Sequence, residues 1–182
     1  MKHFVLIALF SLLTTVASAA ENPLDKGSVI LEGSAFFTSQ SGDAYIDSKT
    51  IIVNPGFSYF VSPGTFVGGL IQYGWYEVGS SSVTEYSLGP VLGYYFNTNK
   101  ERPEPKGAAY PFVMAFAAYG GFDSELTLIQ FGGQAGVTLM ASNAVGVTFE
   151  ARLSHDIWDS DEADSRSGLT FQIGFGLTSF IY

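Results

Sequence analysis

The sequence LTFQIGFGLTSFIY, residues 169–182, decides the fold. As far as Leu177, large apolar residues occupy every second position, and the positions between them hold Thr, Gln or Gly. Successive side chains of a β-strand point to opposite faces, so one face of this strand suits hydrocarbon and the other suits a narrow, more polar space. The pattern therefore predicts a β-strand that crosses a membrane.

Seven segments upstream have the same character. Each is bounded by turn-forming residues and is long enough for the roughly nine to eleven residues that a tilted membrane strand needs. Helical periodicity is absent, and an even number of strands is what bacterial single-chain barrels require. We predict an all-β fold, an eight-stranded antiparallel transmembrane up-and-down β-barrel. The expected strands are 28–38, 50–61, 66–78, 83–96, 110–119, 126–140, 144–154 and 169–181.

The faces opposite the apolar residues carry mostly Gly, Ser, Thr and Gln. Small residues of this kind fit the interior of a tight barrel, whereas the polar face of a soluble sheet would carry Lys, Glu and Arg. A secreted soluble barrel with a lipid inside is the alternative, and it requires apolar residues inside and charges outside. The clearest outward set argues against it: Val145, Val147, Phe149, Ala151 and Leu153.

The first nineteen residues read as a secretory signal peptide. Lys2 precedes an apolar run over 4–13, and Ala17-Ser18-Ala19 has the small-residue pattern of a cleavage site. The run is too short to cross a bilayer as a helix, and no later apolar stretch is long enough. We expect a signal peptide over 1–19 and one outer-membrane β-barrel domain over 20–182.

The composition restricts the function. Charged residues make up 14% and aromatic residues 15% of the chain, against roughly 25% charged residues in a soluble domain. The net charge of −9 argues against a nucleic-acid partner, because phosphates would be repelled. The absence of cysteine excludes disulfides and a lipid-modified cysteine. No glycine pair precedes a helix, so no phosphate-binding motif and no cofactor are expected.

The connections between the strands suggest an orientation. Residues 62–65 and 141–143 form short turns, as on the periplasmic side of such barrels, and residues 97–109 form an unusually long one. The remaining connections, including the acidic stretch 156–167, are expected to face outward.

Aromatic residues then fall into two bands, as amphipathic rings do at the two headgroup levels of a membrane. The band nearer the periplasm would include Tyr59, Tyr94, Phe96, Phe180 and Tyr182, and the outer band would include Tyr73 and Trp75.

Pro55 and Pro90 lie inside two of the expected strands. Proline has no N–H to donate, whereas a closed barrel pairs every strand on both sides. We therefore expect a bulge or a local gap in the ladder at each proline.

The signal peptide, the segment Gly89-Pro90-Val91-Leu92-Gly93-Tyr94-Tyr95-Phe96 and the aromatic terminus resemble the bacterial outer-membrane β-barrel domain family of OmpA-type and OmpX-type small barrels. The resemblance covers nearly all of residues 20–182. It implies that barrel-assembly machinery reads the C-terminal strand through a terminal aromatic residue and alternating hydrophobic positions. Phe180 and Tyr182 fit that signal, but the run from Leu169 to Leu177 has the opposite phase, so either a bulge intervenes or the signal is a variant.

Three charges are expected to point into the barrel at mid-strand: Glu32, Glu150 and Arg152. Buried charges need partners, and Arg152 is long enough to cross the lumen to Glu32. The resemblance implies a plug of salt bridges, acting either as a gate or as a static polar core.

Ser154, His155 and Asp156 suggest a hydrolase, but adjacent residues on a strand face opposite sides, so the serine and the histidine are not placed for proton transfer. The acidic stretch that contains Asp159, Asp161, Glu162 and Asp164 lacks the glycine and the terminal glutamate of an EF-hand loop, so no metal site is expected.

We therefore expect an integral outer-membrane protein with a structural or surface-interaction role and no enzymatic activity. A small passive channel for ions or solutes is the alternative, and a lipid-modifying enzyme is less well supported. The expected partners are outer-membrane lipids, lipopolysaccharide and the barrel-assembly machinery, and the expected oligomeric state is monomeric.

Overall fold

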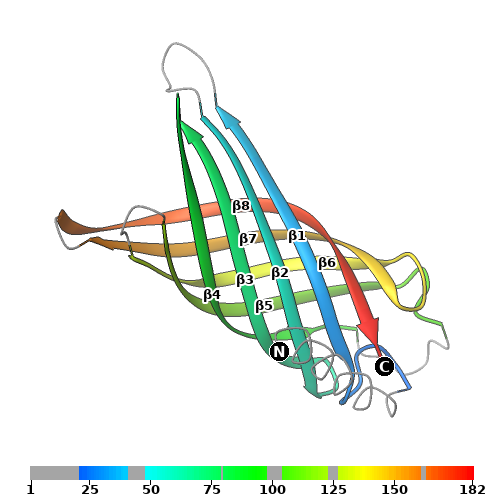
Figure 1. Cartoon of the computed structure of the whole chain (residues 1–182). Coiled ribbons are helices and arrows are strands. Elements are labelled where there is room, and N and C mark those ends of the chain that lie inside the picture. The colour runs from blue at the N-terminus through cyan, green and yellow to red at the C-terminus, as the bar shows by residue number, and fades with distance from the viewer. Residues whose placement is uncertain (1–20, 41–47, 79, 98–103, 123–126, 161–162) are drawn as a thin grey trace, which may run out of the picture.

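The computed structural model describes residues 21–40, 48–78, 80–97, 104–122, 127–160 and 163–182. They form a closed barrel in which each strand is antiparallel to the next and the eighth strand returns to the first (Figure 1). The strands are β1 (Val29–Gln40), β2 (Ser48–Ser62), β3 (Thr65–Val78), β4 (Ser81–Tyr95), β5 (Ala109–Phe122), β6 (Thr127–Met140), β7 (Val145–Ser160) and β8 (Ala163–Ile181). The described residues contain no helix that is long and apolar enough to span a membrane.

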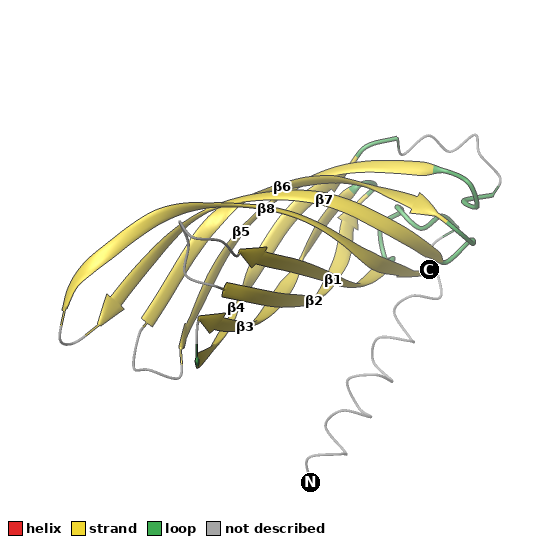
Figure 2. Cartoon of the chain, turned by 90° about the horizontal axis from the view of Figure 1, so that it is seen from above, coloured by secondary structure: helices red, strands yellow, loops and turns green. Residues whose placement is uncertain are grey.

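The predicted fold, with all eight strands, is confirmed. Most of the described loop residues gather at the end of the barrel that carries the C-terminus (Figure 2). We call this end, with the turns near Gly64 and Asn143, the turn end, and the opposite end the hairpin end. The predicted signal peptide over 1–19 lies outside the described residues, as do Asp161 and Glu162.

The prediction of an outer loop over 156–167 is wrong, because most of that stretch extends β7 and β8. Asp156 pairs with Gly168, and Ile157 pairs with Ser167. Asp156 and Ile157 continue the inward and outward alternation of β7: Asp156 is buried, and its carboxylate accepts hydrogen bonds inside the barrel. The acidic composition of this stretch predicts a loop, but the alternation of its side chains continues through it.

The two prolines that lie inside strands leave local gaps in the ladder. A gap is one of the two outcomes predicted from the sequence, the other being a bulge. Pairing of β2 with β3 stops at Val53 and resumes at Gly56, and pairing of β4 with β5 stops at Leu88 and resumes at Val91. The register is the same on both sides of each gap, so neither proline creates a bulge. Each proline is still paired with the strand on its other side: Pro55 with Gly33 of β1, and Pro90 with Gly69 of β3. The missing N–H therefore coincides with the edge of the strand where the ladder is interrupted.

The side chains divide between an apolar exterior and a mixed interior. Along β8, the outward residues from Leu169 to Leu177 are 62–74% exposed, while Thr178 is buried. Charged and amide side chains such as Arg152 and Gln72 are almost fully buried inside the barrel. This is the reverse of a soluble barrel that holds a lipid inside.

Glycines on the inner wall make room for aromatic rings. An added Cβ would lie 2.2 Å from the ring of Phe36 at Gly174, and 2.2 Å from the ring of Phe66 at Gly93. Since such distances are far below van der Waals contact, the rings occupy the space that a side chain would need. The small residues between the apolar positions of the sequence therefore serve close packing inside the barrel.

The ladder between β1 and β8, which closes the barrel and which we call the seam, is shorter than the ladder between β1 and β2. β1 pairs with β8 over seven positions, from Val29 to Ala35, and with β2 over twelve. In the described part of the chain, the ladder ends at Ala35 and Phe175, and the two strands diverge toward the hairpin end (Figure 1). The β8 backbone over 163–174 is therefore paired on one side only, with β7.

Replacing Gly93 with valine should destabilise the folded barrel. The new Cβ would meet the Phe66 ring at 2.2 Å and Met114 Cβ at 2.7 Å, and such overpacking costs about 1–3 kcal/mol. Gly69→Val is the matched control, because a Cβ there meets only the Gly89 carbonyl oxygen, at 3.6 Å. Urea unfolding in detergent, followed by gel mobility, checks the difference. Equal midpoints for the two variants would contradict this packing.

Hydrogen exchange should reveal the short seam. In detergent micelles, the β8 amides over 168–174 that face away from β7 should exchange faster than the amides over 176–180 that face β1, because only the latter lie within the β1–β8 ladder. Residue-resolved NMR exchange rates test this. Uniform protection along both edges of β8 would show that the seam is paired throughout.

Candidate functional site: the interior of the barrel

Aromatic rings close the barrel at the turn end. Tyr95 is at the centre, with ring centroids 5.5 Å from Phe66, 5.1 Å from Phe112, and 6.0 Å from Phe60 and Phe180. Tyr95 belongs to β4, and the four phenylalanines come from β2, β3, β5 and β8. All five side chains are at most 5% exposed. We call them the aromatic plug. They fill the cross-section with hydrocarbon.

The N-terminal segment before β1 adds a cover to the plug. Leu24 is 2% exposed and belongs to the same apolar cluster. Its carbonyl oxygen accepts a hydrogen bond from the Gly64 amide at 2.8 Å, and the Gly64 carbonyl accepts one from the Tyr95 amide at 2.8 Å. The cover is thus tied to the β2–β3 turn and to β4.

Phe180 departs from the predicted aromatic band, because it points into the plug. Tyr182 packs against the same cluster, and its hydroxyl donates to the Asn143 carbonyl oxygen at 3.2 Å. Pairing of β8 with β7 continues without a register shift from Phe175 to Ser179, so no bulge restores the other phase. The terminal aromatic residues therefore face inward.

The other predicted band residues differ in exposure. Tyr73, Tyr94 and Phe96 are 38–50% exposed on the outer face, and Tyr94 and Phe96 contact each other edge to face at 5.1 Å. Tyr59 and Trp75 are half-buried.

A chain of hydroxyl groups lies above the plug. The Tyr95 hydroxyl is 3.4 Å from Thr138 Oγ1, which is 2.8 Å from Thr148 Oγ1, which is 2.6 Å from Thr178 Oγ1. All four residues are buried. The hydroxyls satisfy one another from β4 across β6 and β7 to β8, so this layer is a chain of paired polar groups rather than an open passage.

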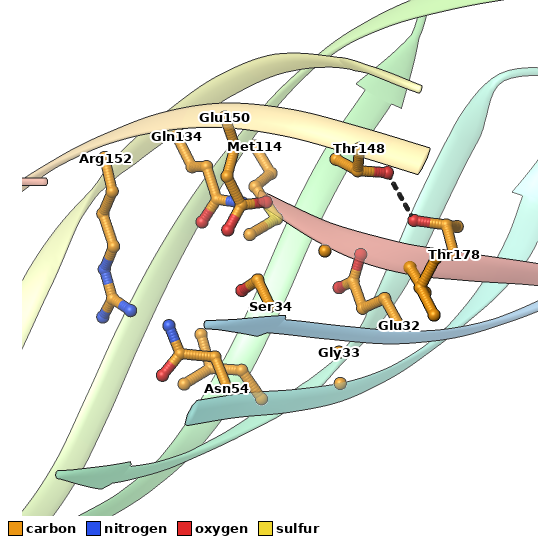
Figure 3. Close-up of a pocket in the computed structure, with 14 residues that line it drawn as sticks. Glu32, Gly33, Ser34, Asn54, Met114, Gln134, Thr148, Glu150, Arg152 and Thr178 are labelled. Carbon is orange, nitrogen blue, oxygen red and sulfur yellow. Dashed lines mark hydrogen bonds between the residues drawn. The ribbon is translucent and has the colours of Figure 1, made fainter. Parts of the chain in front are cut away.

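The three predicted lumen charges line one small cavity at the centre, together with Ser34, Asn54 and Gln134 (Figure 3). The cavity has a volume of about 20 Å³, and holding a single water requires roughly 10–15 Å³. Glu150 accepts a hydrogen bond from Gln134 Nε2 at 2.6 Å. Glu32 lies flat against the wall, where a Cβ at Gly56 would come within 2.8 Å of its Cγ. The lumen charges therefore sit in a nearly filled space.

Arg152 crosses the lumen, and the partner on the far wall is Gln72 rather than the predicted Glu32. Its Nη1 donates to Gln72 Oε1 at 2.8 Å, and its guanidinium lies 3.9 Å from the ring centroid of Phe116. β7 and β3, which carry Arg152 and Gln72, are on opposite sides of the barrel. The contact is a strut across the full width, with a cation–π contact on its flank.

A polar network extends from Arg152 toward the hairpin end. Glu85 accepts hydrogen bonds from Gln72 Nε2 and from the Tyr76 hydroxyl. On the other wall, Asp156 accepts from Gln130 Nε2 at 3.1 Å and from Thr170. Sequence reasoning missed Gln72 as the strut's partner and placed Asp156 in a loop, although both residues have the inward phase of their strands.

His155 does not join Ser154 and Asp156 in a catalytic arrangement. Ser154 and Asp156 are buried inside the barrel, while His155 faces outward with its ring centroid 5.0 Å from that of Phe131. Among the residues that the structure describes, no group of three or more His, Cys, Asp or Glu side chains is arranged to hold a metal ion.

Two solved structures share this architecture. The chain is similar to neisserial surface protein A (NspA), with 16% identity and a TM-score of 0.52 over 85% of this chain and 97% of that chain. It is also similar to the N-terminal β-barrel domain of Pseudomonas aeruginosa OprF, with 16% identity and a TM-score of 0.50 over 85% and 98%. No protein-family model and no curated protein sequence matches the chain. The chain therefore has the fold of the small eight-stranded outer-membrane β-barrels.

Replacing Arg152 with alanine should strongly destabilise the barrel. It leaves the carboxylates of Glu150, Glu85 and Asp156 without a cation at the centre, and breaking a buried charge network by removing one partner costs about 3–5 kcal/mol. Lys106→Ala, at an exposed turn position, is the control and should unfold like the unchanged protein. Urea midpoints in detergent provide the measurement. An Arg152→Ala barrel as stable as the Lys106→Ala barrel would refute the strut.

Proposed function

We propose that this chain is an integral outer-membrane protein whose barrel is closed and whose role is structural or surface-interactive. Residues 1–19 direct export, and the barrel of residues 20–182 inserts from the periplasm. An enzymatic activity is not part of the proposal, because Ser154 and His155 lie on opposite faces of the wall. No cofactor or nucleic-acid partner is proposed.

The apolar exterior supports the membrane location. Leu88, Leu92, Phe149, Leu153 and the outward β8 residues are all more than half exposed. Exposed apolar patches of this extent are rare on soluble monomers, whereas a lipid-facing wall requires them. Outer-membrane lipids and lipopolysaccharide are accordingly the proposed surroundings of the barrel.

The closed interior is the observation that carries the proposed role. The aromatic plug blocks the turn end, the chain of hydroxyls lies above it, and the central cavity leaves only about 20 Å³ around the lumen charges. Ions need a continuous wet path, and three successive layers interrupt it. What remains available for function is the outer wall and the hairpin end.

Assembly and oligomeric state complete the proposal. We propose that the barrel-assembly machinery reads the C-terminal strand through its outward residues, Leu169 to Leu177, because Phe180 and Tyr182 are engaged inside. The barrel is proposed to be monomeric, since β1 closes onto β8 within one chain.

A small passive channel is the second candidate. The polar network of Gln72, Glu85, Arg152 and Asp156 in the hairpin half favours it, because such groups can line a wet path. That path would still have to cross the aromatic plug. The two candidates therefore differ in conductance.

Planar-bilayer recording of the refolded barrel should show no steady conductance. A Tyr95→Ala variant that remains folded should also show none, because the threonine hydroxyls and the nearly filled space around the lumen charges still interrupt the path. Gly69→Val, on the outer wall, should stay silent. Folding and location are checked first by heat-modifiable gel mobility of the outer-membrane fraction. Steady conductance from the unchanged protein would favour the channel. Absence of the protein from the outer-membrane fraction would remove both candidates.

A further inference from the structure

The outer wall carries a groove that the proposed function does not use. It runs across β5, β6, β7 and β8, has a volume of about 610 Å³ and is open to the outside. Its floor consists of Gly133, Ala135 and Ala151, whose side chains are too small to fill it. Its walls are large apolar side chains, namely Phe131, Leu153 and Phe171. The groove is thus a hollow between bulky side chains of the outer wall.

His155 stands at the end of this groove that lies nearer the hairpin end. It is half-buried, and its ring contacts the ring of Phe131 at 5.0 Å. It pairs laterally with Phe131 and Leu169, so it belongs to the outward set of β7. Ionisable residues on lipid-facing surfaces are costly and usually mark a function. Both imidazole nitrogens have the capacity for hydrogen bonds.

We propose that the groove binds one acyl chain of an outer-leaflet lipid, and that His155 donates a hydrogen bond to an oxygen at the polar end of that chain. Ala151 is four residues from His155 toward the turn end, about 13 Å along the strand, so the chain lies along the floor with its polar end outermost. The lipid's oxygen is an ester or amide carbonyl or a hydroxyl.

The surroundings select a lipid as the occupant. The groove is continuous with the apolar exterior: Phe131, Leu153, Leu169 and Phe171 are 48–74% exposed. This inference rests on the proposed membrane location, in which hydrocarbon is the medium that covers the wall. A hollow with a small-residue floor lets one chain approach the backbone more closely than the other lipids around the barrel.

The experiment compares lipid retention by native mass spectrometry. Delipidated barrel in detergent is titrated with dipalmitoylphosphatidylethanolamine, and the fraction with one bound lipid is measured. Gly133→Leu fills the groove, and a Cβ there meets only the Met114 carbonyl oxygen, at 3.6 Å, so the variant should fold. We expect affinity to fall about tenfold, equivalent to roughly 1.4 kcal/mol.

Two further variants make the test specific. Gly69→Leu is the matched control, because its Cβ has the same 3.6 Å contact with a carbonyl oxygen but lies on β3, outside the groove, and it should bind like the unchanged protein. His155→Phe keeps the ring and loses the hydrogen bond, so affinity should fall about two- to tenfold.

Several outcomes overturn the inference. The inference is overturned if Gly133→Leu binds the lipid as tightly as the unchanged barrel. It is also overturned if Gly69→Leu loses as much lipid affinity as Gly133→Leu. A dimer that Gly133→Leu dissociates would assign the groove to a second copy of the chain instead. Heat-modifiable mobility in the outer-membrane fraction is measured for every variant, so a failure of the membrane location is recognised separately from a failure of lipid binding.

Discussion

Pairing of backbone polar groups is the constraint on which this structure depends. A hydrocarbon layer offers no partners for N–H and C=O groups, so a sheet that crosses it must close on itself. Eight antiparallel strands achieve this where β8 returns to β1, over the seven pairs from Val29 to Ala35. Closure at this size leaves an interior only as wide as the side chains that fill it, which explains why glycines face the rings of Phe36 and Phe66. The closed interior therefore follows from the way the backbone is satisfied.

The interior is divided along its length according to the same logic. Aromatic rings fill the turn end, where Tyr95 contacts four neighbours, and polar groups fill the rest. Arg152 connects the parts: its guanidinium lies over Phe116 and donates to Gln72 on the far wall. A buried cation at this point offsets the carboxylates of Glu150, Glu85 and Asp156. The polar interior thus holds opposite walls together in the absence of any disulfide.

The sequence was sufficient to predict the strands, the faces of those strands that alternate, and a disturbed ladder at Pro55 and Pro90, because each depends on local alternation or on a missing N–H. It was insufficient where a contact spans the barrel. The partner of Arg152 depends on which strand lies opposite β7, and that depends on the stagger of all eight strands. The bands of aromatic residues predict that Phe180 faces outward, although the phase of Leu169 to Leu177 places it inside. The charge around Asp156 predicts a loop, although the strand continues through it.

The edge of β8 has a consequence before the protein reaches its membrane. Residues 169–182 contain no charge and no proline, and they alternate large apolar residues with small ones. In water, such a segment with an unpaired edge is a template for self-association, since neither a gatekeeper charge nor a neighbouring strand protects it. The feature that suits β8 to a lipid-facing wall therefore makes it prone to aggregate in an aqueous compartment. A holding chaperone that covers Leu169, Phe171 and Ile173 until insertion would remove that hazard.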